Sequence, residues 1–245
     1  MSTLLTRAFQ SELRRTREVT AQHVQQAWTN LGSYNRSDIS TYLDRILPMV
    51  QAGQARAVAL TSAYLSRTLN QPVVGLSVAD LSGAAVRNGT DPETVYTRAF
   101  VGVWSDLKNG NGWDDAVTTG ADRVQSSAEM DVALSSRAAT LAFGARDGSQ
   151  IVGWRRVAEA SCCDYCQAID GAHTGPTEPQ PLHNRCGCTA EPITKTSGLH
   201  SAEPFLLAGV IIGDVVIHQH GELGPVIGQK GDNFTSEADL ADSGD

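Results

Sequence analysis

The sequence predicts an α+β protein, in which a mainly helical N-terminal part is followed by a small β-rich Cys/His module and an extended acidic C-terminal tail. Apolar residues recur at helical spacing through most of residues 3–143. β-Branched and aromatic residues replace that pattern from Ile151 onward, and all five cysteines lie between Cys162 and Cys188. We therefore expect a helical domain over 1–150, a Cys/His module over 151–195, and a β-hairpin with the acidic tail over 196–245.

The composition sets limits on function. The chain has 41% apolar and 19% charged residues, which is typical of a folded domain with a sizeable core. A net charge of −8 disfavours nucleic-acid binding as the main role, although a local contact with nucleic acid is compatible with it. No run approaches the roughly 18 apolar residues of a membrane-spanning helix, and no signal peptide begins the chain. Free cysteines without an export signal fit a reducing cytoplasm, and we expect no membrane partner.

The first expected helix covers residues 3–31. Leu5, Phe9 and Leu13 are spaced by four, and Val24 and Trp28 resume the apolar stripe. Arginines crowd the span in between. A helix packed only within its own domain more often has an unbroken stripe, so we interpret this gap as part of a surface that docks on another protein. The alternative is an exposed helix with a kink.

Proline and glycine divide the rest of the helical part. Asp38 is the expected N-cap of a second helix that Pro48 should break or kink, and a third helix should end at Asn70. After a connection over 73–90, Asp91 followed by proline predicts a fourth helix start. The region 113–143 is helical and alanine-rich, with possible interruptions at Gly120 and at Met130-Asp131.

The C-terminal third has strand patterns. Residues Ile151–Val157 predict a strand. Two β-branched triplets flank Gly213-Asp214, which predicts a tight hairpin or, as the alternative, one strand with a bulge at Gly213. From Gly221 onward the chain is rich in glycine and acidic residues, so we expect it to be mobile or ordered only against a partner.

The cysteines are arranged as metal ligands. Cys163-x-x-Cys166 lets two sulfurs face one ion, and His183-x-x-Cys186 and Cys186-x-Cys188 supply a second pair. Tetrahedral zinc takes four such ligands, so these five residues are the candidates for a structural zinc site. The choice between His183 and Cys188 stays open, and Cys162 is an alternative to Cys163. Disulfides, a redox pair and ordinary thiols are the other readings of the same cysteines.

Two further features of the sequence bear on the interpretation of the cysteines as a metal site. The stretch between the two ligand pairs is rich in glycine and proline, so we expect a turn-rich loop that a metal, and not apolar burial, keeps folded. His218 and His220 share one face of a strand, but no third ligand accompanies them, and we interpret them as ordinary surface residues. No phosphate-binding loop, dinucleotide fingerprint, His-Glu-x-x-His motif or nucleophile elbow occurs, so we assign no catalytic or cofactor-binding residue.

The Cys/His module resembles the C-terminal module of the MuF-like head-morphogenesis proteins of tailed phages. The resemblance rests on an ordered set over about 40 residues, which runs Val152-x-Trp154, Cys163-x-x-Cys166-x-x-x-Asp170-Gly171 and Pro181-x-His183-x-x-Cys186-x-Cys188. The family typically ends this module in His-x-x-Cys-Arg-Cys, whereas here Gly187 is the middle residue and the arginine lies earlier, at Arg185. The segment from Gly221 to Pro225 is similar to the tails of such proteins in actinobacterial phages.

The resemblance implies a minor head protein with a structural role in head morphogenesis. Such a protein would be located in the virion, and in the host cytoplasm during assembly, with the portal or the major capsid protein as its partner. The helix over residues 4–31 would then lie against the portal. The alternatives are a capsid maturation protease that acts on scaffold or major capsid protein, and a nucleic-acid-binding zinc module.

Overall fold

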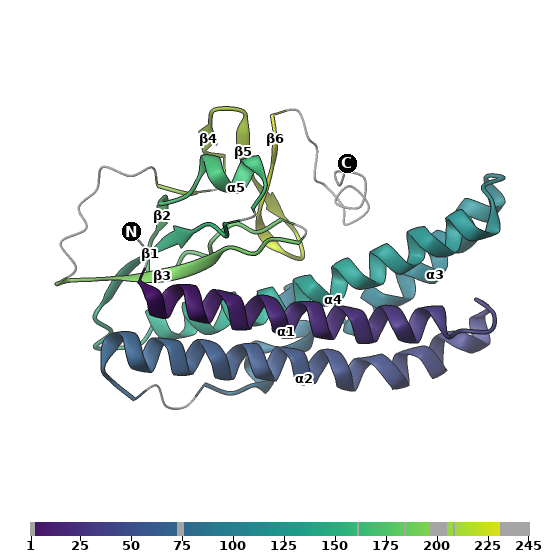
Figure 1. Cartoon of the computed structure of the whole chain (residues 1–245), viewed down its shortest axis with the longest axis horizontal. Coiled ribbons are helices and arrows are strands. Elements are labelled where there is room, and N and C mark those ends of the chain that lie inside the picture. The colour runs from purple at the N-terminus through teal and green to yellow at the C-terminus, as the bar shows by residue number, and fades with distance from the viewer. Residues whose placement is uncertain are drawn as a thin grey trace.

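The computed structural model describes residues 3–72, 76–160, 162–183, 185–196, 205–207 and 209–230. Within them, the chain forms a layer of long helices with two small antiparallel sheets on one side of it (Figure 1). The predicted α+β class, with helices first and strands last, is confirmed. The helices are α1 (Leu4–Thr29), α2 (Arg36–Leu69), α3 (Pro92–Lys108), α4 (Trp113–Gly144) and the short α5 (Asp164–Ala168), with 3₁₀ turns at Ala79–Leu81 and Gly83–Arg87.

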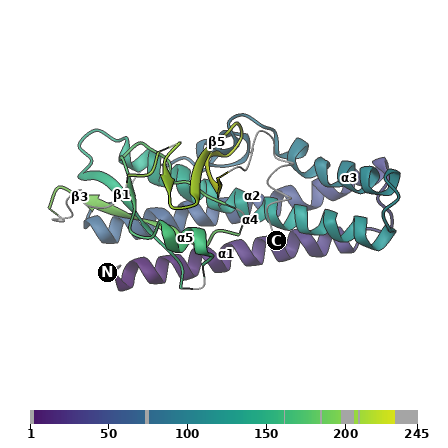
Figure 2. The same ribbon diagram turned by 90° about the horizontal axis from the view of Figure 1, so that it is seen from above.

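In the helical layer α1, α2 and α4 pack against one another, while α3 packs on α4 at the end far from the sheets (Figures 1 and 2). Its core is aromatic: Trp28 is fully buried and contacts the rings of Tyr34, Tyr42 and Phe100. The Trp28 indole also donates a 3.0 Å hydrogen bond to the carbonyl of Val117. None of the helices in the described ranges combines the length and apolar character that a membrane crossing requires.

Helix α1 corrects the interpretation of its interrupted stripe. The gap between Leu13 and Val24 is filled by Arg17, Thr20 and Ala21, all of them buried. The Thr20 hydroxyl bonds to a carbonyl one turn earlier, which lets a polar residue occupy an interior position. The buried face is therefore continuous along the helix, and the pattern no longer argues for a separate docking surface.

Helix α2 shows that the prediction of two helices divided at Pro48 was wrong. One helix of 34 residues runs through Pro48. Proline removes one backbone donor, but Pro48 and Asp44, whose carbonyl loses its partner, are both exposed to water. Ile46 and Val50 are buried on either side, so core packing holds the helix across the proline. The helix also begins earlier than expected, with Asn35 as N-cap and Asp38 closing a capping box.

Helices α3 and α4 are close to prediction. Asp91 caps α3 by accepting a 2.8 Å hydrogen bond from the backbone of Glu93, as expected. Helix α4 has no interruption, because both residues expected to break it have packing roles. Gly120 lies against Trp28, where a Cβ atom would come within 2.3 Å of the indole ring. Asp131 is buried and bound to Arg87 and Tyr96.

The first sheet has the order β2-β1-β3, with strands β1 (Ile151–Val157), β2 (His173–Thr174) and β3 (Thr189–Thr194). The second has the order β4-β5-β6, with strands β4 (Ile211–Ile212), β5 (Val215–His220) and β6 (Gly224–Gln229). β1 and the hairpin of β4 and β5 confirm the sequence predictions, and Gly213 turns the hairpin with a φ of +62°. β3 was not expected.

Strand β6 corrects the expectation that the chain has no fixed structure from Gly221 onward. It pairs with β5 along its length and buries Val226 and Ile227. Backbone bonds also join β6 to Leu182, just before His183. The predicted mobility of residues 230–245 falls, beyond Lys230, outside the described residues.

Apolar burial contributes to the stability of the Cys/His module. Cys166, Ile169 and Leu182 belong to an apolar cluster that also contains Leu134 of α4 and Ile217 of β5. The expectation of a loop without apolar burial was therefore wrong, because the burial comes from parts of the chain that lie far away in sequence. The division at 150/151 and at 195/196 stays a prediction.

Candidate metal centre

The candidate metal centre lies where α5 and the segment before β3 meet the C-terminal end of β1. Cys163 is the N-cap residue of α5, and Cys166 follows one helical turn later. His183, Cys186 and Cys188 lie in the segment that leads into β3. That segment bends sharply at Arg185, a non-glycine residue with a φ of +56°. The turn brings the second group of predicted ligands back onto α5.

The side chains converge. His183 Nε2 lies 2.8 Å from the sulfur of Cys166 and 3.3 Å from that of Cys163. The sulfurs of Cys166 and Cys186 are 3.8 Å apart, which matches the edge of about 3.8 Å expected for two thiolates on one tetrahedral zinc ion with Zn–S bonds of about 2.3 Å.

The described residues contain two groups close enough to hold a metal ion. They are Cys163, Cys166 and His183, and Cys166, Cys186 and Cys188, with the ligand atoms of each group within 4.8 Å of one another. Cys166 belongs to both. All five predicted candidates are therefore brought together, and Cys162 is in neither group. Cys162 packs instead against the apolar cluster, and all five cysteines are free thiols, not disulfides.

The candidate cysteine ligands differ in how deeply they are buried. Cys166 and Cys186 are buried, Cys188 is half-buried and Cys163 is exposed. The hydrogen bond between Cys166 and Cys186 lowers the pKa of Cys186 well below its ordinary value and raises the pKa of Cys166. For Cys188, a hydrogen bond with Cys166 works in the lowering direction, but one with Cys186 and burial together raise the pKa to about 12. The cluster therefore favours a thiolate on Cys186, which is the form that binds a metal.

Arg156 was missed by the sequence reasoning. This arginine of β1 is only 1% exposed. It donates hydrogen bonds of 3.3 Å and 3.2 Å to the sulfurs of Cys166 and Cys186, and one of 2.6 Å to the carbonyl of Pro181. Burial alone would lower its pKa, but the neighbouring cysteines raise it. The signal was present in the alternation of the strand, because Trp154 and Arg156 are two residues apart and so share a face.

Polar side chains of α1 bind the Cys/His module. Gln10 Nε2 donates to the carbonyls of Val157 and Gly187, at 3.0 Å and 3.2 Å. Arg7 donates to the carbonyl of Ala158 at 2.7 Å, and Arg14 lies 3.1 Å from the carboxylate of Glu159. A row of polar side chains on one helix face thus fixes the end of β1 and the ligand segment.

The expectation that both histidines of β5 are surface residues was wrong for His220. His220 is buried, and its Nδ1 accepts hydrogen bonds of 3.1 Å from the backbone of Glu222 and of Leu223. It therefore shapes the turn into β6. Neither His218 nor His220 belongs to a group of three metal-ligating side chains within the described ranges.

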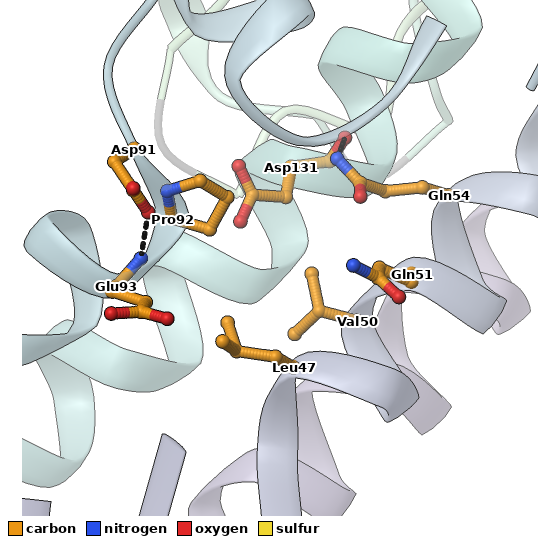
Figure 3. A pocket seen from close by; sticks show the side chains of 8 residues that line it. All are labelled: Leu47, Val50, Gln51, Gln54, Asp91, Pro92, Glu93 and Asp131. Atoms are coloured by element: carbon orange, nitrogen blue, oxygen red, sulfur yellow. Dashed lines mark hydrogen bonds between the residues drawn. The ribbon is translucent and has the colours of Figure 1, made fainter. Parts of the chain in front are cut away.

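A separate cavity of about 170 Å³ lies between α2, the start of α3 and α4 (Figure 3). Its walls are formed by Leu47, Val50, Gln51, Gln54, Asp91, Pro92, Glu93 and Asp131. Asp91 caps α3, and Asp131 accepts hydrogen bonds from Arg87 and Tyr96. Two of its three carboxylates thus already serve the packing of the helices.

Comparison of the chain with protein-family models, with curated proteins and with solved structures finds no match.

Proposed function

We propose that this chain is a minor head protein of a tailed phage, of the MuF-like type, in which a structural zinc ion fixes the Cys/His module. The observation that carries the proposal is the convergence of the five predicted ligands, which lie in the order of the family motif. The portal or the major capsid protein is the partner we propose.

Four of the other motif residues, Trp154, Asp170, Gly171 and Pro181, also have structural roles in this module. The Trp154 indole donates a 2.9 Å hydrogen bond to the carbonyl of Pro176, and the Asp170 carboxylate accepts one of 2.7 Å from the backbone of Ala158. Gly171 has a φ of +82°, which favours glycine over residues with a side chain. Pro181 presents its carbonyl to Arg156. Each of these motif residues therefore stabilises the same small module, which supports the resemblance.

The donor set fits zinc and a structural role. Thiolate and imidazole ligands suit Zn²⁺, and a structural site has four protein ligands, whereas a catalytic one keeps a position for water. The two groups of three donors share Cys166 and together offer enough protein ligands to fill a four-coordinate site. The ion would join α5 to the segment before β3, and Arg156 of β1 already contacts Cys166 and Cys186 in these two parts. Its role would be to hold the module rigid on the helical layer while other surfaces make the contacts of assembly.

The test has two parts. Protein purified without chelator should contain about one zinc per chain. Particles assembled with the wild-type protein should contain it, and the Cys166→Ser variant should be depleted from them, whereas Cys162→Ser should be incorporated normally. A wild-type protein without metal would contradict the zinc centre. Absence of the wild-type protein from purified heads would contradict the head-protein assignment, and loss of scaffold or capsid cleavage in a variant that is still incorporated would favour the protease.

A further inference from the structure

Arg156 differs from Arg87, the other arginine of the described residues that is only 1% exposed. Arg87 pairs with the carboxylate of Asp131. Arg156 has no carboxylate within ion-pair distance in the described part of the chain, and its acceptors are one carbonyl and two cysteine sulfurs. Its neighbour in sequence, Arg155, points the other way and pairs with Glu191. The fold thus keeps a permanent cation beside Cys166 and Cys186.

A buried charge is costly unless an opposite charge accompanies it. Neutral thiols are weak acceptors and do not offset a guanidinium, whereas metal-bound thiolates carry the negative charge that it requires. The buried guanidinium of Arg156 is therefore explained by a negatively charged centre at Cys166 and Cys186.

We propose that Arg156 is the counter-cation of the metal centre and selects a ligand set of three cysteines and His183. This inference rests on the zinc site proposed above and deepens it. A divalent ion with three thiolates and one neutral imidazole has a charge of −1, which one guanidinium neutralises. Four thiolates would leave a buried charge of −1 after the same pairing. The charge balance thus favours His183 as a ligand, and only one of Cys163 and Cys188 binds at a time.

Arg156 acts through the ligands, and it is a positioning residue. Its bonds to the two sulfurs orient the inner pair, and its bond to Pro181 fixes the chain two residues before His183. Partners of this kind in the outer shell typically contribute a factor of about 10–100 to metal affinity.

Co²⁺ titration of the full chain tests the proposal, because the visible bands report tetrahedral geometry and the charge-transfer intensity reports the number of thiolates. Arg156→Met should bind Co²⁺ and Zn²⁺ about 10–100-fold more weakly than the wild type. Arg156→Lys, which keeps the charge, should recover most of the affinity. Arg155→Gln is the matched control and should bind as the wild type does.

The outcomes separate the two proposals. A wild-type protein that gives no tetrahedral Co²⁺ spectrum would overturn the metal centre itself. Equal affinities of the wild type and Arg156→Met, or a lysine variant as weak as the methionine variant, would overturn the role of Arg156 alone. A charge-transfer band of four thiolates would contradict the ligand set.

Discussion

The hydroxyl of Thr6 donates a 2.7 Å hydrogen bond to the carboxylate of Glu191, which joins the first turn of α1 to β3 although the two residues are 185 positions apart in the sequence. The backbone amide of Thr3 reaches the same oxygen at 3.1 Å, and Arg155 pairs with the other one. Glu191 is buried. The start of the helical layer and the last strand of the Cys/His module are thus fixed to each other by one carboxylate.

This carboxylate should make stability depend on pH. Burial alone would raise the pKa of Glu191, but the hydrogen bonds from Thr6, Thr3 and Arg155 lower it. A folded-state pKa below the unfolded value of about 4.3 adds stability above that pH, and the contribution is lost as the pH falls through the folded pKa. In urea denaturation, the free energy of unfolding should therefore fall less steeply below about pH 4.3 in Glu191→Gln than in the wild type. Glu12→Gln, on the exposed face of α1, should keep the wild-type slope.

Close approach of α1 and α4 at Gly120 gives a second prediction. A Cβ atom at residue 120 would lie 2.3 Å from the Trp28 ring and 3.0 Å from Val103, both of them buried. Gly120→Ala should therefore lower the free energy of unfolding by about 1–3 kcal/mol through overpacking. Gly102→Ala is the matched control, because nothing lies within 4 Å of the added atom in α3. It should raise the free energy of unfolding by roughly 0.5–1 kcal/mol, as expected for glycine replaced in a helix. Equal effects of the two changes would contradict this account.

Metal removal gives a third prediction. If zinc is held at about 1,000 times its dissociation constant, its binding adds about 4 kcal/mol to the free energy of unfolding, and a chelator should remove that increment. Cys186→Ser should do the same and should abolish the response to the chelator. The aromatic core around Trp28 contains no residue of the module, so far-UV circular dichroism should retain most of the helix signal. Hydrogen exchange should rise in residues 158–189. A global loss of helix would show that the layers do not fold separately.

The sequence predicted the local features and missed those that depend on distant residues. The cap at Asp91, the turn at Gly213 and the five converging ligands follow from short-range chemistry, and the structure contains each of them. Pro48 looked like a helix end because its effect was judged alone, whereas buried neighbours on both sides hold the helix together. Strand β6 has glycines and a proline, and its order comes from pairing with β5.

Buried polar residues were the other source of error. Arg17 and Thr20 seemed to interrupt the stripe of α1, because a polar residue in a sequence is read as exposed. Deletion of residues 1–31 would remove Phe9, Leu13 and Trp28 from the core, so the shortened chain should not fold, and that deletion no longer tests docking on the portal. Charge-reversing changes confined to exposed positions of α1, such as Arg15→Glu, are the suitable probe.

The last prediction concerns the buried ion pair of Arg87 and Asp131. Arg87 of the second 3₁₀ turn contacts the carboxylates of Asp131 and Glu222, and Tyr96 donates a 2.8 Å hydrogen bond to Asp131. The pair thus joins the connection before α3, the middle of α4 and the turn before β6. Removing one partner leaves the other charge buried, so Asp131→Leu should lower the free energy of unfolding by about 3–5 kcal/mol.

The double variant Arg87→Met with Asp131→Leu distinguishes a costly charge from lost packing. Two apolar residues of similar volume leave no unpaired charge at this position, so the double variant should recover much of the stability lost in Asp131→Leu. Glu222 keeps its second partner Arg98, at 2.9 Å, and the turn before β6 stays attached. Urea denaturation of the wild type, both single variants and the double variant measures the coupling. Additive losses in the double variant would mean that this network stabilises the fold through packing alone.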